Sequence, residues 1–138
     1  MLQPAKTKYR KWHRRRNTER DIATSGHRLS FGAYGLKAMS GGEITARQLE
    51  AARKAIAHCL KRGGKIWIRI FPHQPITRKA AEVPMGAGKG TVEFYISQIK
   101  RGHIIMEMDG VDETLARKAM RLAASKLPVR TKFIMTEH

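Results

Sequence analysis

A chain of 138 residues with 41% hydrophobic residues is long enough to bury a core, which excludes a disordered polycation. Lys and Arg number 28 against 11 Asp and Glu, and the formal net charge of +17 indicates a polyanionic partner. The cations are spread over several predicted elements rather than along one basic amphipathic helix, which favours nucleic acid over an anionic membrane. No apolar run is long enough for a transmembrane helix, and Cys59 as the only cysteine fits a reducing compartment.

Residues 1–26 are basic and poor in aliphatic side chains, so this segment cannot bury enough surface to fold alone. At this net charge we expect a basic N-terminal arm that orders on RNA, with Tyr9 and Trp12 stacking on bases. The alternative is a solvated tail whose two aromatic side chains pack back onto the domain. The cations of this arm that we expect to contact RNA are Lys6, Lys8, Arg10, Lys11, Arg14, Arg15 and Arg16.

The first half of the folded part reads as an irregular strand, a glycine break and a helix. Residues 28–38 alternate enough to predict a strand in which Leu29 and Phe31 share a face. After the break at residues 41–42, Thr45 and Gln48 form a capping box for a helix that runs to about residue 62 and stops at Gly63. On its outer face we expect Arg47 and Lys54, either solvated or in contact with RNA, and an ion pair of Glu50 with Lys54.

The second half predicts three strands, a helix and a last strand. Strand 65–71 places Arg69 on the face opposite its isoleucines, and strands 91–99 and 103–109 join as a hairpin across a turn at residues 100–102. Glu107 and Asp109 read as surface charges. Asp112 caps a helix over residues 113–126, and residues 131–135, which include Lys132, form the final strand. The order favours an α+β fold, with two helices on one face of a mainly antiparallel sheet.

Residues 72–91 form a long connection with neither helical nor strand periodicity, which is typical of a functional loop. Three cations and a glycine cluster in it suit close approach of the backbone to phosphate: Arg78, Lys79, Lys89, Gly86, Gly88 and Gly90. An ATP- or GTP-binding P-loop is the rival interpretation from the enzyme class. It fails because Val83 stands where glycine is needed and a strand, not a helix, follows. The scattered histidines predict no metal site, and no catalytic group is recognisable.

Several long motifs in order then carry a resemblance: MLQPAKTKYRK, SFGAYGLKA, ITARQLEAARKAI, GGKIWIRIFP, MGAGKG followed by TVEFY, and LAASKLPVRTKF. Over almost the whole length, from Met1 to about Lys132, the sequence resembles the bacterial and organellar large-ribosomal-subunit protein sixteen family. The resemblance implies a single ribosomal-protein domain over residues 1–138 that is structural rather than enzymatic. The protein would work in the ribosome, cytoplasmic or organellar. It would need no cofactor, metal, membrane or small-molecule substrate.

The resemblance also implies partners and sites. The partners are large-subunit rRNA, neighbouring ribosomal proteins, and tRNA in the A site and close to the P site, with a role in late assembly. Arg69 and Lys132 join the arm as rRNA contacts. The side chains expected to face tRNA are Arg47, Lys54, Arg78, Lys79, Met85, Gly86, Gly88 and Lys89. The chain departs from the family at Pro84 and Ala87, where relatives commonly carry arginine and lysine. A modification that some relatives carry on that arginine is therefore impossible here.

Overall fold

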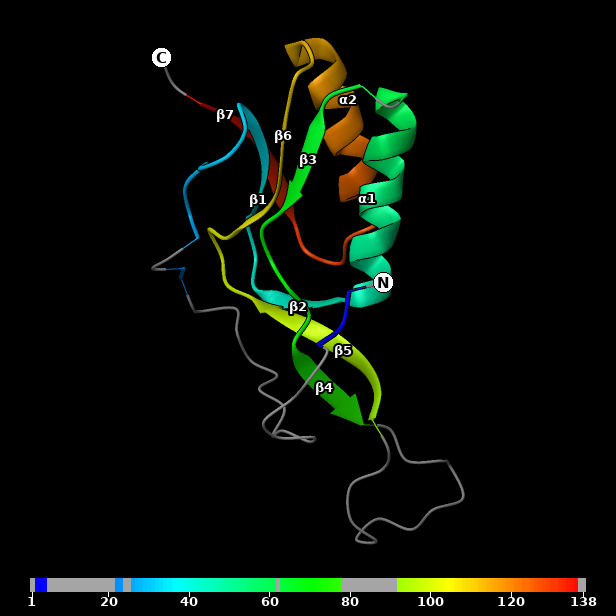
Figure 1. Cartoon of the computed structure of the whole chain (residues 1–138). Helices are drawn as coiled ribbons and strands as arrows, with labels where there is room; N and C mark the ends of the chain where they lie inside the picture. The colour runs from blue at the N-terminus through cyan, green and yellow to red at the C-terminus, as the bar shows by residue number, and fades with distance from the viewer. Residues whose placement is uncertain (1, 5–21, 24–25, 62, 78–91, 137–138) are drawn as a thin grey trace, which may run out of the picture.

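The computed structural model describes residues 2–4, 22–23, 26–61, 63–77 and 92–136 (Figure 1). Two antiparallel sheets and two helices make up this part of the chain. The larger sheet has the order β3-β6-β1-β7, formed by Lys65–Ile68, Ile104–Asp109, Tyr34–Ala38 and Thr131–Met135. The smaller sheet has the order β2-β5-β4, formed by Gly42–Thr45, Val92–Ile99 and Gln74–Thr77. The helices are α1, Ala46–Leu60, and α2, Glu113–Ala124.

The core lies between the two helices and one face of the larger sheet. Figure 1 shows α1 and α2 side by side on that face, with the smaller sheet at one end of the molecule. Leu36 of β1, Met106 and Met108 of β6, Ile56 of α1 and Met120 of α2 are buried together in one cluster. The predicted α+β class is therefore confirmed.

The ends of both helices follow from local chemistry. The Thr45 hydroxyl accepts from the Gln48 backbone N–H at 3.1 Å, and the Gln48 side chain accepts from the Thr45 N–H at 2.9 Å, so the predicted capping box is confirmed. α1 ends earlier than predicted, because Lys61 rather than Gly63 takes the left-handed conformation, with φ of 50°. Asp112 caps α2 as expected, by accepting from the Leu115 N–H at 3.0 Å.

The predicted hairpin between residues 91–99 and 103–109 is wrong. β5 pairs with β2 and β4, whereas β6 pairs with β1 and β3, so the two strands belong to different sheets. The backbone of the turn between them bonds elsewhere: Gly102 N–H donates to the Ala38 carbonyl at 2.7 Å, and Ala38 N–H donates to the His103 carbonyl at 2.8 Å. The root of the N-terminal arm also bonds here, because Ala23 N–H donates to the Arg101 carbonyl at 2.9 Å.

Other element boundaries also differ from the prediction, at places where contacts with residues distant in the sequence determine the secondary structure. Gly42, read as part of a break at residues 41–42, begins strand β2, and residues 74–77 of the expected loop are strand β4. The strand predicted over residues 28–38 begins only at Tyr34. The final strand, residues 131–135, is confirmed.

We expect Thr45→Ala to lower the free energy of unfolding by about 1 kcal/mol, because it removes one half of the capping box. Urea denaturation followed by circular dichroism measures the loss. Thr114→Ala is the matched control, since Thr114 is exposed within the first turn of α2 and should shift stability by no more than about 0.5 kcal/mol. Equal effects of the two variants would contradict a stabilising role for the cap.

Candidate nucleic-acid interface

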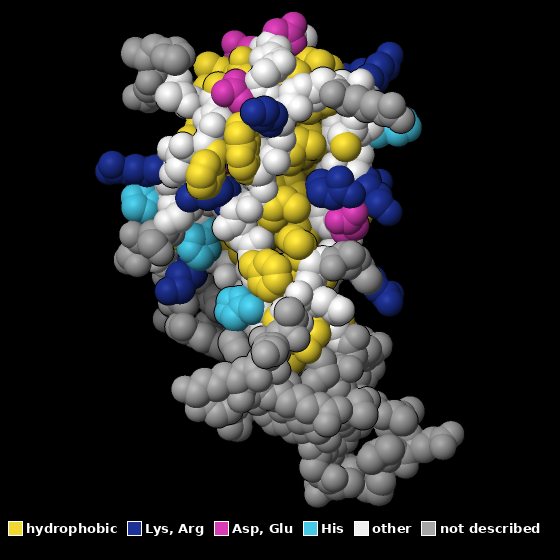
Figure 2. Space-filling model, viewed as in Figure 1, with side chains coloured by type: hydrophobic (Ala, Val, Ile, Leu, Met, Phe, Trp, Pro, Cys, Tyr) yellow, Lys and Arg dark blue, Asp and Glu magenta, His cyan; other side chains and the backbone are white. Residues whose placement is uncertain are grey.

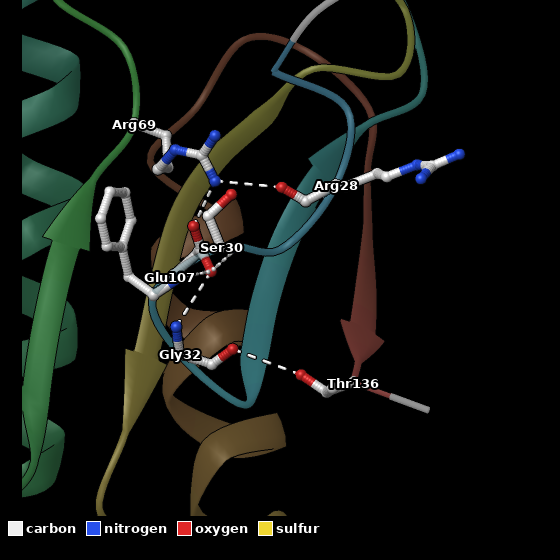
Figure 3. A network of polar contacts seen from close by, with 7 residues as sticks. Arg28, Ser30, Gly32, Arg69, Glu107 and Thr136 are labelled. Atoms are coloured by element: carbon white, nitrogen blue, oxygen red, sulfur yellow. Dashed lines mark hydrogen bonds and ion pairs between the residues drawn. The ribbon is translucent and has the colours of Figure 1, made fainter. Parts of the chain in front are cut away.

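A buried carboxylate organises the face of the larger sheet that points away from the helices. Glu107 of β6 is 0% exposed. Its Oε1 accepts from the backbone N–H groups of Ser30, Phe31 and Gly32 at 2.9, 3.0 and 3.1 Å, while its Oε2 accepts from the Arg69 guanidinium (Figure 3). We call these five residues the Glu107 clamp. The clamp joins a loop, β6 and the chain just after β3.

Strand register explains why this carboxylate is covered. Glu107 lies opposite Gly35 of β1 and Trp67 of β3, and it alternates with the core residues Met106 and Met108. Leu29 lies over Gly35, where a Cβ atom would come within 2.4 Å of the leucine Cδ2. The chain before β1 therefore folds across the outer face of the sheet and buries Glu107. The expectation that Glu107 is a surface charge is wrong.

The electrostatics of the clamp favour the ionised carboxylate. Burial raises the pKa of Glu107, but hydrogen bonds from the Gly32 N–H, the Arg69 guanidinium and the other two N–H groups outweigh it. The net result is a pKa below the ordinary value. Arg69 also donates to the Arg28 carbonyl at 3.1 Å. The structure thus places Arg69, a predicted rRNA contact, inside an internal ion pair.

Two lysines face each other across neighbouring strands of the same sheet. Lys132 of β7 lies directly opposite Lys37 of β1; the neighbouring residues Leu36 and Ala38 belong to the core, and Phe133 packs against it. Both ammonium groups therefore extend from the outer face. Like charges directly opposite each other destabilise an antiparallel pair, so this arrangement suits an anion that both side chains can contact.

The outer surface of α1 carries the cations expected there. Arg47 and Lys54 are exposed. Glu50 pairs with Arg53 rather than with Lys54, through an Arg53 Nε bond of 3.1 Å, and this hydrogen bond lowers the pKa of Glu50. Figure 2 shows apolar side chains running down the middle of one face of the molecule, with Lys and Arg side chains beside them and at the edges.

The remaining predicted site residues lie outside the described residues. They are Lys6, Lys8, Tyr9, Arg10, Lys11, Trp12, Arg14, Arg15 and Arg16 of the arm, and Arg78, Lys79, Met85, Gly86, Gly88 and Lys89 of the loop. Within the part that the structure describes, no cluster of His, Cys, Asp or Glu could hold a metal ion, and no helix is long and apolar enough to cross a membrane.

The structure adds two residues that the sequence did not single out for a site, Glu107 and Lys37. Lys37 carries no local signal, since only the register of β1 against β7 shows that it faces Lys132. For Glu107 the one available signal is its position between Met106 and Met108 in a strand. That signal fits a solvent-facing side chain equally well.

We expect Glu107→Gln to lower the free energy of unfolding by about 3 kcal/mol, because it leaves the Arg69 guanidinium without its anionic partner. Urea denaturation measures this without screening the charges. Glu113→Gln is the control, because the exposed pair of Glu113 with Arg117 is worth at most about 0.5 kcal/mol. Equal losses would show that the clamp contributes no more than a surface pair.

Acid should erase the difference between wild type and Glu107→Gln. A carboxylate whose folded pKa is depressed stabilises the fold above its unfolded pKa and loses that contribution as the pH falls through the folded value. The gap should therefore be full at pH 7 and shrink below about 4.5, the ordinary glutamate value. Burial also lowers the pKa of His103, so the subtraction of the two curves, rather than wild type alone, isolates Glu107. A gap that is constant down to pH 3 would contradict the ionised clamp.

Comparison with known protein families agrees with this arrangement of a basic chain on an α+β framework. A family model described as ribosomal protein L16p/L10e matches residues 4–134. The match includes both helices, the described strands β1 to β6, β7 except for Met135, the segment predicted as arm from residue 4 onward, and the predicted loop. The chain therefore belongs to the ribosomal protein L16p/L10e family, as a structural constituent of the large ribosomal subunit.

Proposed function

We propose that this protein binds large-subunit rRNA through its basic arm and the outer face of the larger sheet, and that it presents to tRNA residues 78–91, the part of the predicted loop that follows β4. The tRNA occupies the A site, with the loop approaching the P site, and the protein supports late assembly and tRNA positioning. Family membership supports the ribosomal location and the rRNA and protein partners, and the ribosomal family is structural in general rather than enzymatic.

The opposed lysines are the observation that carries the rRNA proposal. Lys37 and Lys132 lie at one register position on a face that the helices do not cover. In the free chain their repulsion has no compensating anion within the strands themselves. An RNA phosphate between them removes the repulsion and adds two charge-assisted hydrogen bonds.

The smaller sheet supports the tRNA proposal as a rigid base for the loop. β4 and β5 flank residues 78–91, and their register pairs Gln74 with Ile96 and Ile76 with Phe94. Gln74, Ile76 and Ile96 are buried. Because paired strands hold both ends of this segment, we infer that its cations act at a defined place on the subunit.

Sedimentation of cell lysate tests the location directly. A ribosomal constituent travels with the large subunit, whereas a free-standing RNA chaperone stays near the top of the gradient.

Lys132→Gln should weaken binding to large-subunit rRNA and reduce the slope of log affinity against log salt by about 1, because one phosphate contact is lost. The same substitution should leave the stability of the free chain unchanged or slightly raised, since it relieves the repulsion from Lys37. Filter binding over a salt series and urea denaturation supply the two readouts.

Lys118→Gln removes the same charge from an exposed position on α2 and serves as the control. It should change rRNA affinity less than Lys132→Gln does. If both variants lose affinity equally, net charge rather than the opposed pair carries the binding.

Lys89→Ala should slow tRNA accommodation several-fold while the variant still enters large subunits normally, because Lys89 lies in the loop and not in the proposed rRNA surface. Rapid-kinetic accommodation assays on purified ribosomes measure the first effect and gradient quantification measures the second. Lys126→Ala, an exposed lysine just after α2, is the control for loss of one charge. Equal impairment of assembly and accommodation would count against a positioning role.

A further inference from the structure

An aromatic hollow lies at the free edge of the larger sheet, next to the Glu107 clamp. Its volume is about 600 Å³, and it is lined by Phe31, Gly64, Lys65, Trp67, Asp109 and Gly110. β3 is the edge strand here, since the sheet order begins with it. We call this feature the β3 hollow.

Two stacked rings form its wall. The ring centroids of Phe31 and Trp67 are 6.1 Å apart, with 21° between the ring planes. Phe31 is nevertheless 58% exposed. Its backbone N–H is bound by Glu107, and the Arg69 guanidinium lies 5.3 Å from its ring centroid. An exposed ring held this firmly is a preorganised stacking surface, because its position costs no further ordering when a partner arrives.

Two glycines, Gly64 and Gly110, also line the hollow. A Cβ atom on Gly64 would come within 2.7 Å of the Asp109 carbonyl, and one on Gly110 within 3.1 Å of the Gly64 Cα. Both residues have positive φ, 72° and 83°. The close approach of these two backbones therefore requires glycine at both positions, so this part of the hollow is lined by backbone without side chains.

The charges around the hollow suit a nucleotide. Lys65 lines the hollow and is exposed, so its ammonium group is available to contact a phosphate. Asp109 lines it too, and its carboxylate already accepts from the Gly110 N–H at 2.8 Å. Its remaining acceptor sites suit the amino or imino hydrogens on the edge of a base.

We propose that the β3 hollow receives one unpaired nucleobase of large-subunit rRNA, which stacks on the Phe31–Trp67 wall while its phosphate meets Lys65. The base binding rests on the proposed function, that the protein binds rRNA, and it identifies what the β3 hollow contacts within that RNA. A base fits better than an apolar protein side chain because flat π surfaces, a neighbouring cation and a net charge of +17 coincide.

Base-specific chemical probing of purified large subunits tests the proposal. Subunits that carry Phe31→Leu should show about a tenfold rise in the reactivity of one unpaired base, within the range that base–aromatic stacking spans. Phe31→Tyr keeps the ring and should preserve the protection. Met135→Leu, another exposed apolar side chain, is the control on β7 and should change nothing. An identical rRNA footprint in wild type and Phe31→Leu subunits overturns the proposal.

A second measurement does not depend on the folding of Phe31→Leu. A benzophenone-bearing phenylalanine at position 31 should cross-link to rRNA in assembled subunits. A cross-link to a ribosomal protein, or no cross-link, overturns base binding in the β3 hollow. Neither result contradicts rRNA binding elsewhere on the protein. Absence of the unmodified chain from large subunits would overturn the proposed function, and the hollow with it.

Discussion

The ion pair inside the Glu107 clamp is the interaction on which the outer face depends. A charge removed from water is costly unless it is fully paired, and Glu107 meets this demand with three backbone N–H groups and one guanidinium. These partners come from a loop and from the chain after β3, so one carboxylate fixes two segments that are far apart in sequence. The loop in turn carries Phe31 and leads into β1, which carries Lys37. The edge hollow and the basic face therefore share one anchor.

The features that the sequence predicts correctly depend on residues close together in the chain. The capping box of Thr45 and Gln48, the Asp112 cap and the final strand need no information from elsewhere. The β5–β6 connection shows the opposite case. A short turn between two apolar strands favours a hairpin, yet Gly102 and His103 at this turn form backbone hydrogen bonds with Ala38 of β1. β5 and β6 consequently belong to two different sheets, because residues distant in the sequence determine which strands pair.

The same distinction applies to the site. Charge alone predicts that the chain meets a polyanion, and the arm and loop are visible as runs of cations and glycines. Charge does not show which cations already form ion pairs within the protein, as Arg69 does with Glu107. Charge also does not identify Lys37 as a site residue, because its proposed role depends on its pairing with Lys132 across β1 and β7. Alternation in β6 marks one face as apolar, but a loop that covers the other face leaves no periodic signal.

The attachment of Ile22, Ala23 and Gly26 to the turn after β5 has a mechanical consequence. Ile22 forms a parallel bridge with Arg101, and the Gly26 carbonyl accepts from the Ile104 N–H at 2.8 Å. The turn connects β5, which borders one end of the loop, to β6, which carries Glu107. Because these contacts attach Ile22, Ala23 and Gly26 to this turn, a force applied through the preceding segment would act on the connection between the two sheets.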